Sequence, residues 1–248
     1  VQGALSYFID AYSSLASWRA IMDRLHGFEK AISDASNLPV LARDDKPANY
    51  LKVSGLSINL PNQESLLKNI SFELNSGDHL LIKGASGSGK TTLLRALAGL
   101  WPFASGDISQ NQTKTEMFIA QRPYMPQVSL RQAICYPLTT NLPDDTELST
   151  IMRECGLAYL RSRLDEEVDW GKVLSLGEQQ RVAFARVLVN HPDIIYLDEA
   201  SSALDEAMEA HMYSVLSERL PNSVIISVGH RSTLDIWHNQ QLVLKSAI

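Results

Sequence analysis

Gly84-Ala85-Ser86-Gly87-Ser88-Gly89-Lys90-Thr91 is the stretch of sequence from which the fold can be worked out. It matches G-x-x-x-x-G-K-[ST], in which glycines let successive backbone N–H groups turn toward phosphate oxygens. An apolar strand at residues 79–82 precedes it and a helix begins at Lys90, which is the context that this pattern requires. The stretch therefore predicts a phosphate-binding loop, called the phosphate loop below, at a strand-to-helix junction.

The side chains at the end of the phosphate loop predict the ligand. Lys90 can reach the β and γ phosphates of ATP, and Thr91 offers its hydroxyl to Mg²⁺. The predicted cofactors are therefore ATP and Mg²⁺. The predicted ATP-binding residues are Gly84, Ala85, Ser86, Gly87, Ser88, Gly89, Lys90, Thr91 and Thr92.

Two adjacent acids form a second motif, since the apolar run 194–197 ends in Asp198 and Glu199. A buried strand carries its terminal acids to the sheet edge beside the phosphate loop. Side chains alternate along a strand, so the two acids are expected to act differently. We expect Asp198 to hold Mg²⁺ and Glu199 to be the general base for the attacking water.

Other apolar runs surround these motifs. Runs predict strands at residues 51–58, 70–74, 79–82, 117–120, 194–197, 224–228 and 241–244, with helical patterns between the later ones. Alternating strands and helices indicate an α/β fold with a mainly parallel sheet covered on both faces. From about 122 to 181 the pattern is almost wholly helical, which predicts an inserted helical subdomain.

The N-terminal residues 1–35 form a separate pattern. Apolar side chains recur every three or four positions from Leu5 to Ile32, which predicts one amphipathic helix roughly 45 to 50 Å long. Such a helix is longer than this domain needs, so we expect it to belong partly to another structure; the alternative is that it folds back on the domain. Residues 36–49 read as a linker, and residues 50–248 as the catalytic domain.

Composition disfavours several classes of protein. The 248 residues are 45% apolar with a net charge of −6 and no basic stripe, so no nucleic-acid partner is expected. Cys135 and Cys155 lack metal-ligand spacing and suit a reducing compartment. The sequence lacks a signal peptide and any apolar run of membrane-spanning length, and it begins without Met. We expect a soluble or peripheral fragment of a longer protein.

A third motif, Leu174-Ser175-Leu176-Gly177-Glu178-Gln179-Gln180-Arg181, follows the helical region. With it, the sequence from Leu51 onward resembles the nucleotide-binding domain of ABC transporters, whose signature this motif is similar to. The resemblance implies the ABC-type ATPase core, a parallel sheet plus an antiparallel β part. It also implies that Ser175, Leu176, Gly177 and Glu178 cap the γ-phosphate of ATP bound by a second nucleotide-binding domain. The expected partner is a second copy of the chain, in a head-to-tail homodimer.

The resemblance assigns roles to further positions. It implies that Gln121 senses Mg²⁺ and the attacking water, and that His230 hydrogen-bonds the γ-phosphate. Ser202, Ala203, Leu204 and Asp205, called the 202–205 segment below, would cross to the partner's site. The expected catalytic residues are thus Glu199, His230 and Gln121, and the expected Mg²⁺ residues are Thr91, Gln121 and Asp198.

Two positions depart from the family pattern. Where the family has an aromatic residue to stack on adenine, this sequence has Leu56-Ser57-Ile58-Asn59-Leu60-Pro61, and we expect an apolar contact from Leu60 instead. Leu176 stands where glycine is commonest in the signature. Ser175 and Gly177 are kept, so we expect an active ATPase.

The segment from Gln121 to Pro137 is most similar to the branch that contains peroxisomal fatty acyl transporters and bacterial relatives of the YddA and BacA type. These are half-transporters, in which a membrane domain precedes the ATPase. The resemblance implies that residues 1–35 are the cytoplasmic end of the last membrane helix, and that a transmembrane domain is fused upstream. It places the domain at the cytoplasmic face of a membrane, with a bacterial inner membrane expected. No residue of this sequence is predicted to touch cargo.

Two other functions remain open from the sequence. One is a soluble ATPase of the same superfamily acting on nucleic acid or ribosomes, which would need coiled-coil arms, paired ATPase domains or basic surfaces. The other is a nucleotide-binding regulator that does not hydrolyse ATP. Regulators of this kind usually have another residue in place of Glu199 or His230, whereas this sequence has both.

Overall fold

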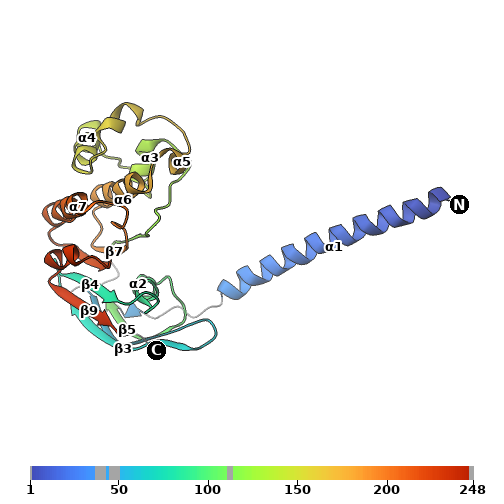
Figure 1. Cartoon of the computed structure of the whole chain (residues 1–248), viewed down its shortest axis with the longest axis horizontal. Coiled ribbons are helices and arrows are strands. Elements are labelled where there is room, and N and C mark those ends of the chain that lie inside the picture. Colours follow the sequence, from blue (N-terminus) through green and yellow to red (C-terminus); the bar gives the residue numbers. More distant parts are fainter. Residues whose placement is uncertain (1, 37–42, 45–50, 111–113, 246–248) are drawn as a thin grey trace. The chain divides into compact units, whose positions relative to one another are not determined.

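The N-terminal helix forms a unit of its own. The computed structural model describes residues 2–36, 43–44, 51–110 and 114–245, and the chain divides into a unit up to Val40 and a unit from Leu41 onward. The first unit contains α1 (Gln2–Ser36), a single long helix (Figure 1). Its exposed apolar side chains are Tyr12, Leu15, Trp18, Ile21, Met22, Leu25, Phe28 and Ile32. Val1, where the predicted helix begins, lies outside the described residues.

A parallel sheet of five strands is the centre of the second unit. Its order is β6 (Glu116–Ile119), β7 (Ile194–Asp198), β8 (Val224–Val228), β4 (His79–Gly84) and β9 (Gln240–Leu244). All neighbouring pairs are parallel. β7 and β8 are buried along their whole length, as expected for central strands covered on both faces.

A second sheet of four strands packs beside the first. Its order is β1 (Arg43–Asp44), β5 (Ala104–Gln110), β2 (Leu51–Asn59) and β3 (Ser65–Leu74), and β2 is antiparallel to both of its neighbours. The sequence reading missed β5, whose residues are mostly small or polar. Its Gly106 has φ +127°, and a Cβ there would lie 2.7 Å from the Leu56 backbone, so glycine lets β5 approach β2.

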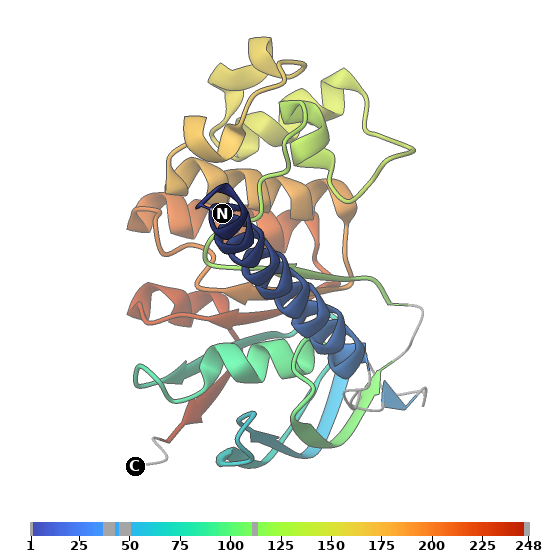
Figure 2. The same ribbon diagram turned by 90° about the vertical axis from the view of Figure 1, so that its right-hand side faces the viewer.

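Helix α2 (Lys90–Leu97) joins the two sheets. It contacts β2 of the antiparallel sheet and β4, β7 and β8 of the parallel sheet (Figure 2). Leu93, Leu94 and Leu97 on α2 are fully buried in this core. The helix that follows the phosphate loop is therefore firmly held between two sheets.

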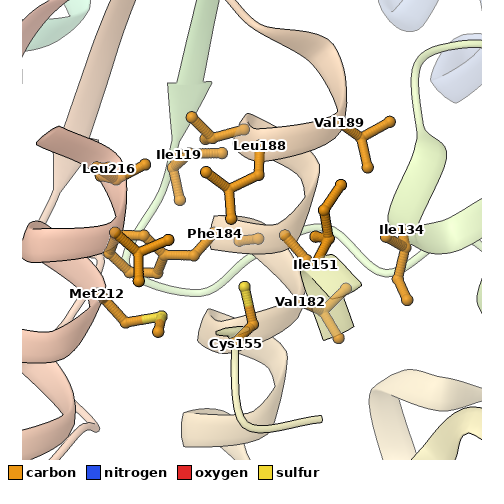
Figure 3. Packing of buried hydrophobic residues seen from close by; sticks show 14 of the residues in the cluster. Ile119, Ile134, Ile151, Cys155, Val182, Phe184, Leu188, Val189, Met212 and Leu216 are labelled. Carbon is orange, nitrogen blue, oxygen red and sulfur yellow. The ribbon is translucent and has the colours of Figure 1, made fainter. Parts of the chain in front are cut away.

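Helices make up most of the remaining chain. They are α3 (Leu130–Cys135), α4 (Asp145–Glu154), η1 (Ala158–Arg163), α5 (Trp170–Val173), α6 (Leu176–Asn190), α7 (Glu206–Arg219) and η2 (Ser232–Trp237). Figure 3 shows Phe184 and Leu188 of α6 packed with Met212 and Leu216 of α7 in one apolar core. This core connects the helical region to the parallel sheet through Ile119.

The predicted fold class is confirmed: an α/β domain with a mainly parallel sheet, an antiparallel part and a long N-terminal helix. Some predicted boundaries are wrong in detail. β3 begins at Ser65 rather than residue 70. α6 continues past Arg181 because no helix-breaking residue comes before His191 and Pro192, and the helical subdomain at about 122–181 stays a prediction. Arg43–Asp44, inside the predicted linker, pair with β5. Linker residues 37–42 and 45–49 lie outside the described residues.

Candidate functional site

The candidate catalytic and phosphate-binding residues lie after or at the ends of four neighbouring strands, at one edge of the parallel sheet. The phosphate loop follows β4, Gln121 follows β6, Asp198 ends β7 and His230 follows β8. Because these strands are parallel and adjacent, their carboxyl ends lie along the same edge. Residues far apart in the sequence therefore meet beside the phosphate loop.

Glycines shape the phosphate loop. Gly87 and Gly89 have φ values of +77° and +89°, which side-chain-bearing residues rarely adopt. The Lys90 ammonium donates to the carbonyls of Gly84 (3.0 Å) and Ala85 (2.8 Å). The buried Ser88 hydroxyl has no hydrogen-bond partner among the described residues. A buried orphan hydroxyl is unusual, and its position suits a loop that binds an oxygen-rich ligand.

Leu66 is a contact that the sequence reading missed. Its side chain packs 3.0 Å from the position that a Cβ would take at Gly89, so β3 covers the loop where α2 begins. Leu60, the expected adenine contact, lies in the turn after β2, where its N–H donates to the Glu64 carbonyl at 2.8 Å. The contact of Leu60 with adenine stays a prediction.

Thr91 and Asp198 meet across the sheet edge. The Thr91 hydroxyl donates to Asp198 Oδ1 at 2.7 Å. Burial raises the pKa of Asp198, while the hydrogen bond from Thr91 and the charges of Arg95 and Lys90 oppose that shift. Burial lowers the pKa of Lys90, and the charges of Glu199 and Asp198 oppose that shift. A hydroxyl and a carboxylate side by side are oxygen donors of the kind that Mg²⁺ prefers.

Glu199 contacts the other two candidate catalytic side chains. Its Oε2 accepts from Gln121 Nε2 at 3.0 Å, and its Oε1 lies 3.2 Å from His230 Nε2. β7 ends at Asp198, and Glu199 adopts a left-handed φ of +50°. Strain of this kind in a residue other than glycine is common at functional sites. Gln121 makes no hydrogen bond to Thr91 or Asp198 in the described part of the chain.

The signature residues Ser175 and Glu178 form a capping box at the start of α6. Ser175 donates to Glu178 Oε2 through its hydroxyl (2.6 Å) and its N–H (2.8 Å). Tyr159 also donates to the Glu178 carboxylate, and the bonds from Ser175 and Tyr159 lower the pKa of Glu178. Within the described residues no hydrogen bond joins Ser175 to the phosphate loop.

Gln180 ties the signature helix to the 202–205 segment. Sequence reasoning quoted this residue within the motif but gave it no role. It is fully buried; its Nε2 donates to the Gln121 carbonyl (2.9 Å) and to Ser202 Oγ (3.2 Å), and its Oε1 accepts from the Ala203 N–H (2.9 Å). A fully buried amide whose donor and acceptor atoms both have partners indicates a structural role for Gln180.

Gly177 packs against the same segment and yields a testable prediction. A Cβ at Gly177 would lie 3.0 Å from the Ala203 carbonyl, so Gly177→Ala should displace the segment by a few tenths of an ångström. We expect ATP hydrolysis to fall about tenfold while ATP binding to the monomer is unchanged. Steady-state hydrolysis and ATP titration measure the two effects.

The control for this substitution is Gly171→Ala, whose new Cβ would meet its neighbours no closer than 3.4 Å. Gly171 is also helical, so the gain in helix propensity is matched. Equal hydrolysis by the two variants would show that the close approach of Gly177 to Ala203 has no functional importance.

The described residues contain neither a metal-ligand cluster nor a membrane-spanning helix. No three His, Cys, Asp or Glu side chains gather as a metal site in this part of the chain. Among the described helices, none combines the length and the apolar character that crossing a bilayer requires.

Comparison with known proteins identifies clear relatives. A family model described as "ABC transporter" matches residues 67–202. An uncharacterized ABC transporter ATP-binding protein of Haemophilus influenzae is 42% identical over 241 residues, covering 97% of this chain and 40% of the relative. The inner membrane ABC transporter ATP-binding protein YddA of Escherichia coli is 36% identical over 241 residues, covering 96% of this chain and 41% of YddA.

Another relative is the human lysosomal cobalamin transporter ABCD4, which is 38% identical over 207 residues, covering 77% of this chain and 33% of that protein. The predicted similarity to proteins of the YddA type is confirmed. The chain spans about two fifths of the length of the bacterial relatives described above.

Proposed function

The chain belongs to the ABC transporter family, as an ATP-binding domain of a type that hydrolyses ATP, and from this premise we propose that it powers movement of a substrate across a membrane. The strongest support for this proposal is the position of the charged side chains at one edge of the parallel sheet. Lys90, the Thr91–Asp198 pair and the Glu199–His230 pair lie at the carboxyl edge of three adjacent strands. This grouping supplies a phosphate-binding cation, a metal-binding pair and a base in one place.

We propose the following roles within one chain. The backbone of the phosphate loop and Lys90 bind the β and γ phosphates. Glu199 accepts a proton from the attacking water, with His230 and Gln121 holding its two carboxylate oxygens in position. Both oxygens already have partners, so the orientation of the carboxylate is determined before water arrives.

Thr91 and Asp198 are the residues that would hold Mg²⁺. Their oxygen atoms fit this hard cation, and the short contact between them shows that they share one location. When bound, Mg²⁺ would neutralise negative charge on the phosphate oxygens. Gln121, predicted as a third Mg²⁺ residue, donates to Glu199, and we propose that it also orients the base. Its contact with Mg²⁺ stays a prediction.

The metal assignment gives a prediction for Asp198→Asn. We expect the apparent affinity for Mg²⁺ in the ATPase reaction to fall about 10- to 100-fold, because a neutral amide replaces the buried carboxylate. A Mg²⁺ titration of hydrolysis at fixed ATP measures this. Asp107→Asn, at an exposed position of β5, is the matched control. An unchanged Mg²⁺ dependence would remove Asp198 from the metal site.

We propose that two copies of the chain complete each ATP site head to tail. The N-terminus of α6, with Ser175 and Gly177, would face the γ-phosphate held by the partner's phosphate loop. The N–H groups of a helix N-terminus favour an anion there. The 202–205 segment, whose Ser202, Ala203 and Asp205 are exposed, would lie between the two sites.

Mixing two inactive variants tests this arrangement. Lys90→Ala removes the phosphate-binding cation, and Ser175→Ala removes the signature hydroxyl. In a head-to-tail heterodimer, one site carries both defects and the other is intact. An equimolar mixture should therefore hydrolyse ATP at about a quarter of the wild-type rate, since about half of the dimers have one good site. A mixture no more active than the separate variants would contradict the composite site.

The proposed location is the cytoplasmic face of a membrane, with α1 extending toward a transmembrane domain in the same protein. Support comes from the names of the relatives, since YddA is described as an inner membrane protein. The proposal covers the ATP-driven step; the described residues do not favour one transported substrate over another. Association of a protein that carries the native upstream sequence with the inner membrane fraction would test the location.

A further inference from the structure

Arg231 connects the histidine loop to the 202–205 segment. It directly follows His230, and its guanidinium donates to the Leu204 carbonyl through Nη1 (2.8 Å) and to the Ser202 carbonyl through Nη2 (3.2 Å). The planar guanidinium can bind two acceptors in fixed directions, which a lysine ammonium cannot do. One side chain thus holds two of the backbone carbonyls in this segment.

Buried Glu209 on α7 anchors this arginine. Its side chain is 2% exposed, and its carboxylate accepts from Ser201 Oγ (2.6 Å) and Thr233 Oγ1 (2.7 Å). Arg231 Nη1 lies 3.5 Å from Glu209 Oε1. A buried carboxylate needs a compensating charge, so Glu209 favours one position of the guanidinium.

These residues share a small cavity with the catalytic pair. The cavity has a volume of about 100 Å³ and is lined by Glu199, His230, Glu209 and Arg231 among others. No hydrogen bond or ion pair joins Arg231 or Glu209 to the phosphate loop within the described residues. Arg231 therefore lies next to the catalytic pair without belonging to the groups that bind phosphate.

The 202–205 segment is held from a second side by the signature helix. Gln180 binds the Ala203 N–H and the Ser202 hydroxyl, whereas Arg231 binds the Ser202 and Leu204 carbonyls. The segment thus has a polar contact with each of the two elements predicted to respond to γ-phosphate. Because Arg231 is the next residue after His230, we expect a shift of the His230 backbone to change how the anchored guanidinium binds these two carbonyls.

We propose that Arg231 is a positioning residue that couples His230 to the 202–205 segment of the same chain, with Glu209 as its buried anchor. The inference rests on the proposed function, in which that segment faces the second ATP site. A change at His230 on one ATP is thereby passed to the segment beside the other ATP. Coupling between sites of this kind typically changes binding affinity by about 5- to 150-fold.

The test compares Arg231→Met and Arg231→Lys with the control Arg219→Met, in the full chain. Arg219 on α7 pairs with Glu154 at 3.2 Å and is 41% exposed, against 35% for Arg231, so the control removes a similar ion pair away from the site. Three quantities are measured: ATP affinity of the monomer, kcat, and the Hill coefficient for ATP. The thermal unfolding midpoint shows whether each variant is folded.

We expect both Arg231 variants to lose about tenfold in kcat and to lose cooperativity, with ATP affinity of the monomer unchanged. If Arg231→Met does not fold, Arg231→Lys tests the inference on its own. Lysine keeps a positive charge beside Glu209 but cannot donate to the Ser202 and Leu204 carbonyls together. Wild-type kcat and Hill coefficient in a folded Arg231 variant would overturn the inference. An inactive wild-type chain would instead overturn the proposed function, so the two failures are distinguishable.

Discussion

Glu199→Gln is expected to bind ATP normally and to hydrolyse it about 10³-fold more slowly than the wild type. Loss of a general base typically costs about 10²- to 10⁴-fold in rate. Glutamine keeps the size of the side chain but cannot accept the proton, and its amide cannot accept from Gln121 and His230 at both terminal atoms. ATP binding should persist, because Lys90 and the phosphate loop are unaltered.

Single-turnover hydrolysis measures the rate of ATP cleavage, and size-exclusion chromatography with ATP measures the ATP-bound state of the variant. The slow variant should accumulate as an ATP-bound dimer, which we expect the wild type to form only transiently. Glu218→Gln, at an exposed position of the same domain, is the control for loss of one negative charge. A normal turnover rate for Glu199→Gln would show that another group is the base.

Lys90→Ala is expected to weaken ATP binding about 100-fold, the equivalent of about 3 kcal/mol. The Lys90 side chain is almost completely buried and donates to two carbonyls of the phosphate loop. Alanine removes the charge that faces the phosphates and leaves these two carbonyls without that donor. Both effects weaken the binding of ATP, whereas Glu199→Gln slows its hydrolysis.

Equilibrium titration with a fluorescent ATP analogue measures this loss. The control is Lys52→Ala, which removes a half-exposed lysine paired with Glu73 at 3.2 Å in the antiparallel sheet. The unfolding midpoint of each variant separates a weaker site from a damaged fold. Equal affinity of Lys90→Ala and the wild type would contradict the assignment of residues 84–91 as the phosphate-binding loop.

Local motifs predicted much of the fold and the family. Sequence patterns predict well those features that depend on neighbouring residues. Examples are the strand-loop-helix context of Gly84 to Thr91 and the apolar runs that form the buried strands β7 and β8. β5 was not predicted because its sequence contains no apolar run. Its place depends on pairing with β2, a contact between distant segments.

The sequence alone thus determined the phosphate loop, the acids Asp198 and Glu199 at the end of β7, the signature and the family resemblance, because each motif is a short pattern with its own chemistry. Only the tertiary structure decided how these groups contact one another. In the structure Gln121 donates to Glu199, and Gln180 and Arg231 hydrogen-bond the backbone of the 202–205 segment. Such contacts join residues many positions apart, and their geometry follows from the order of strands in the sheet, which no local pattern encodes.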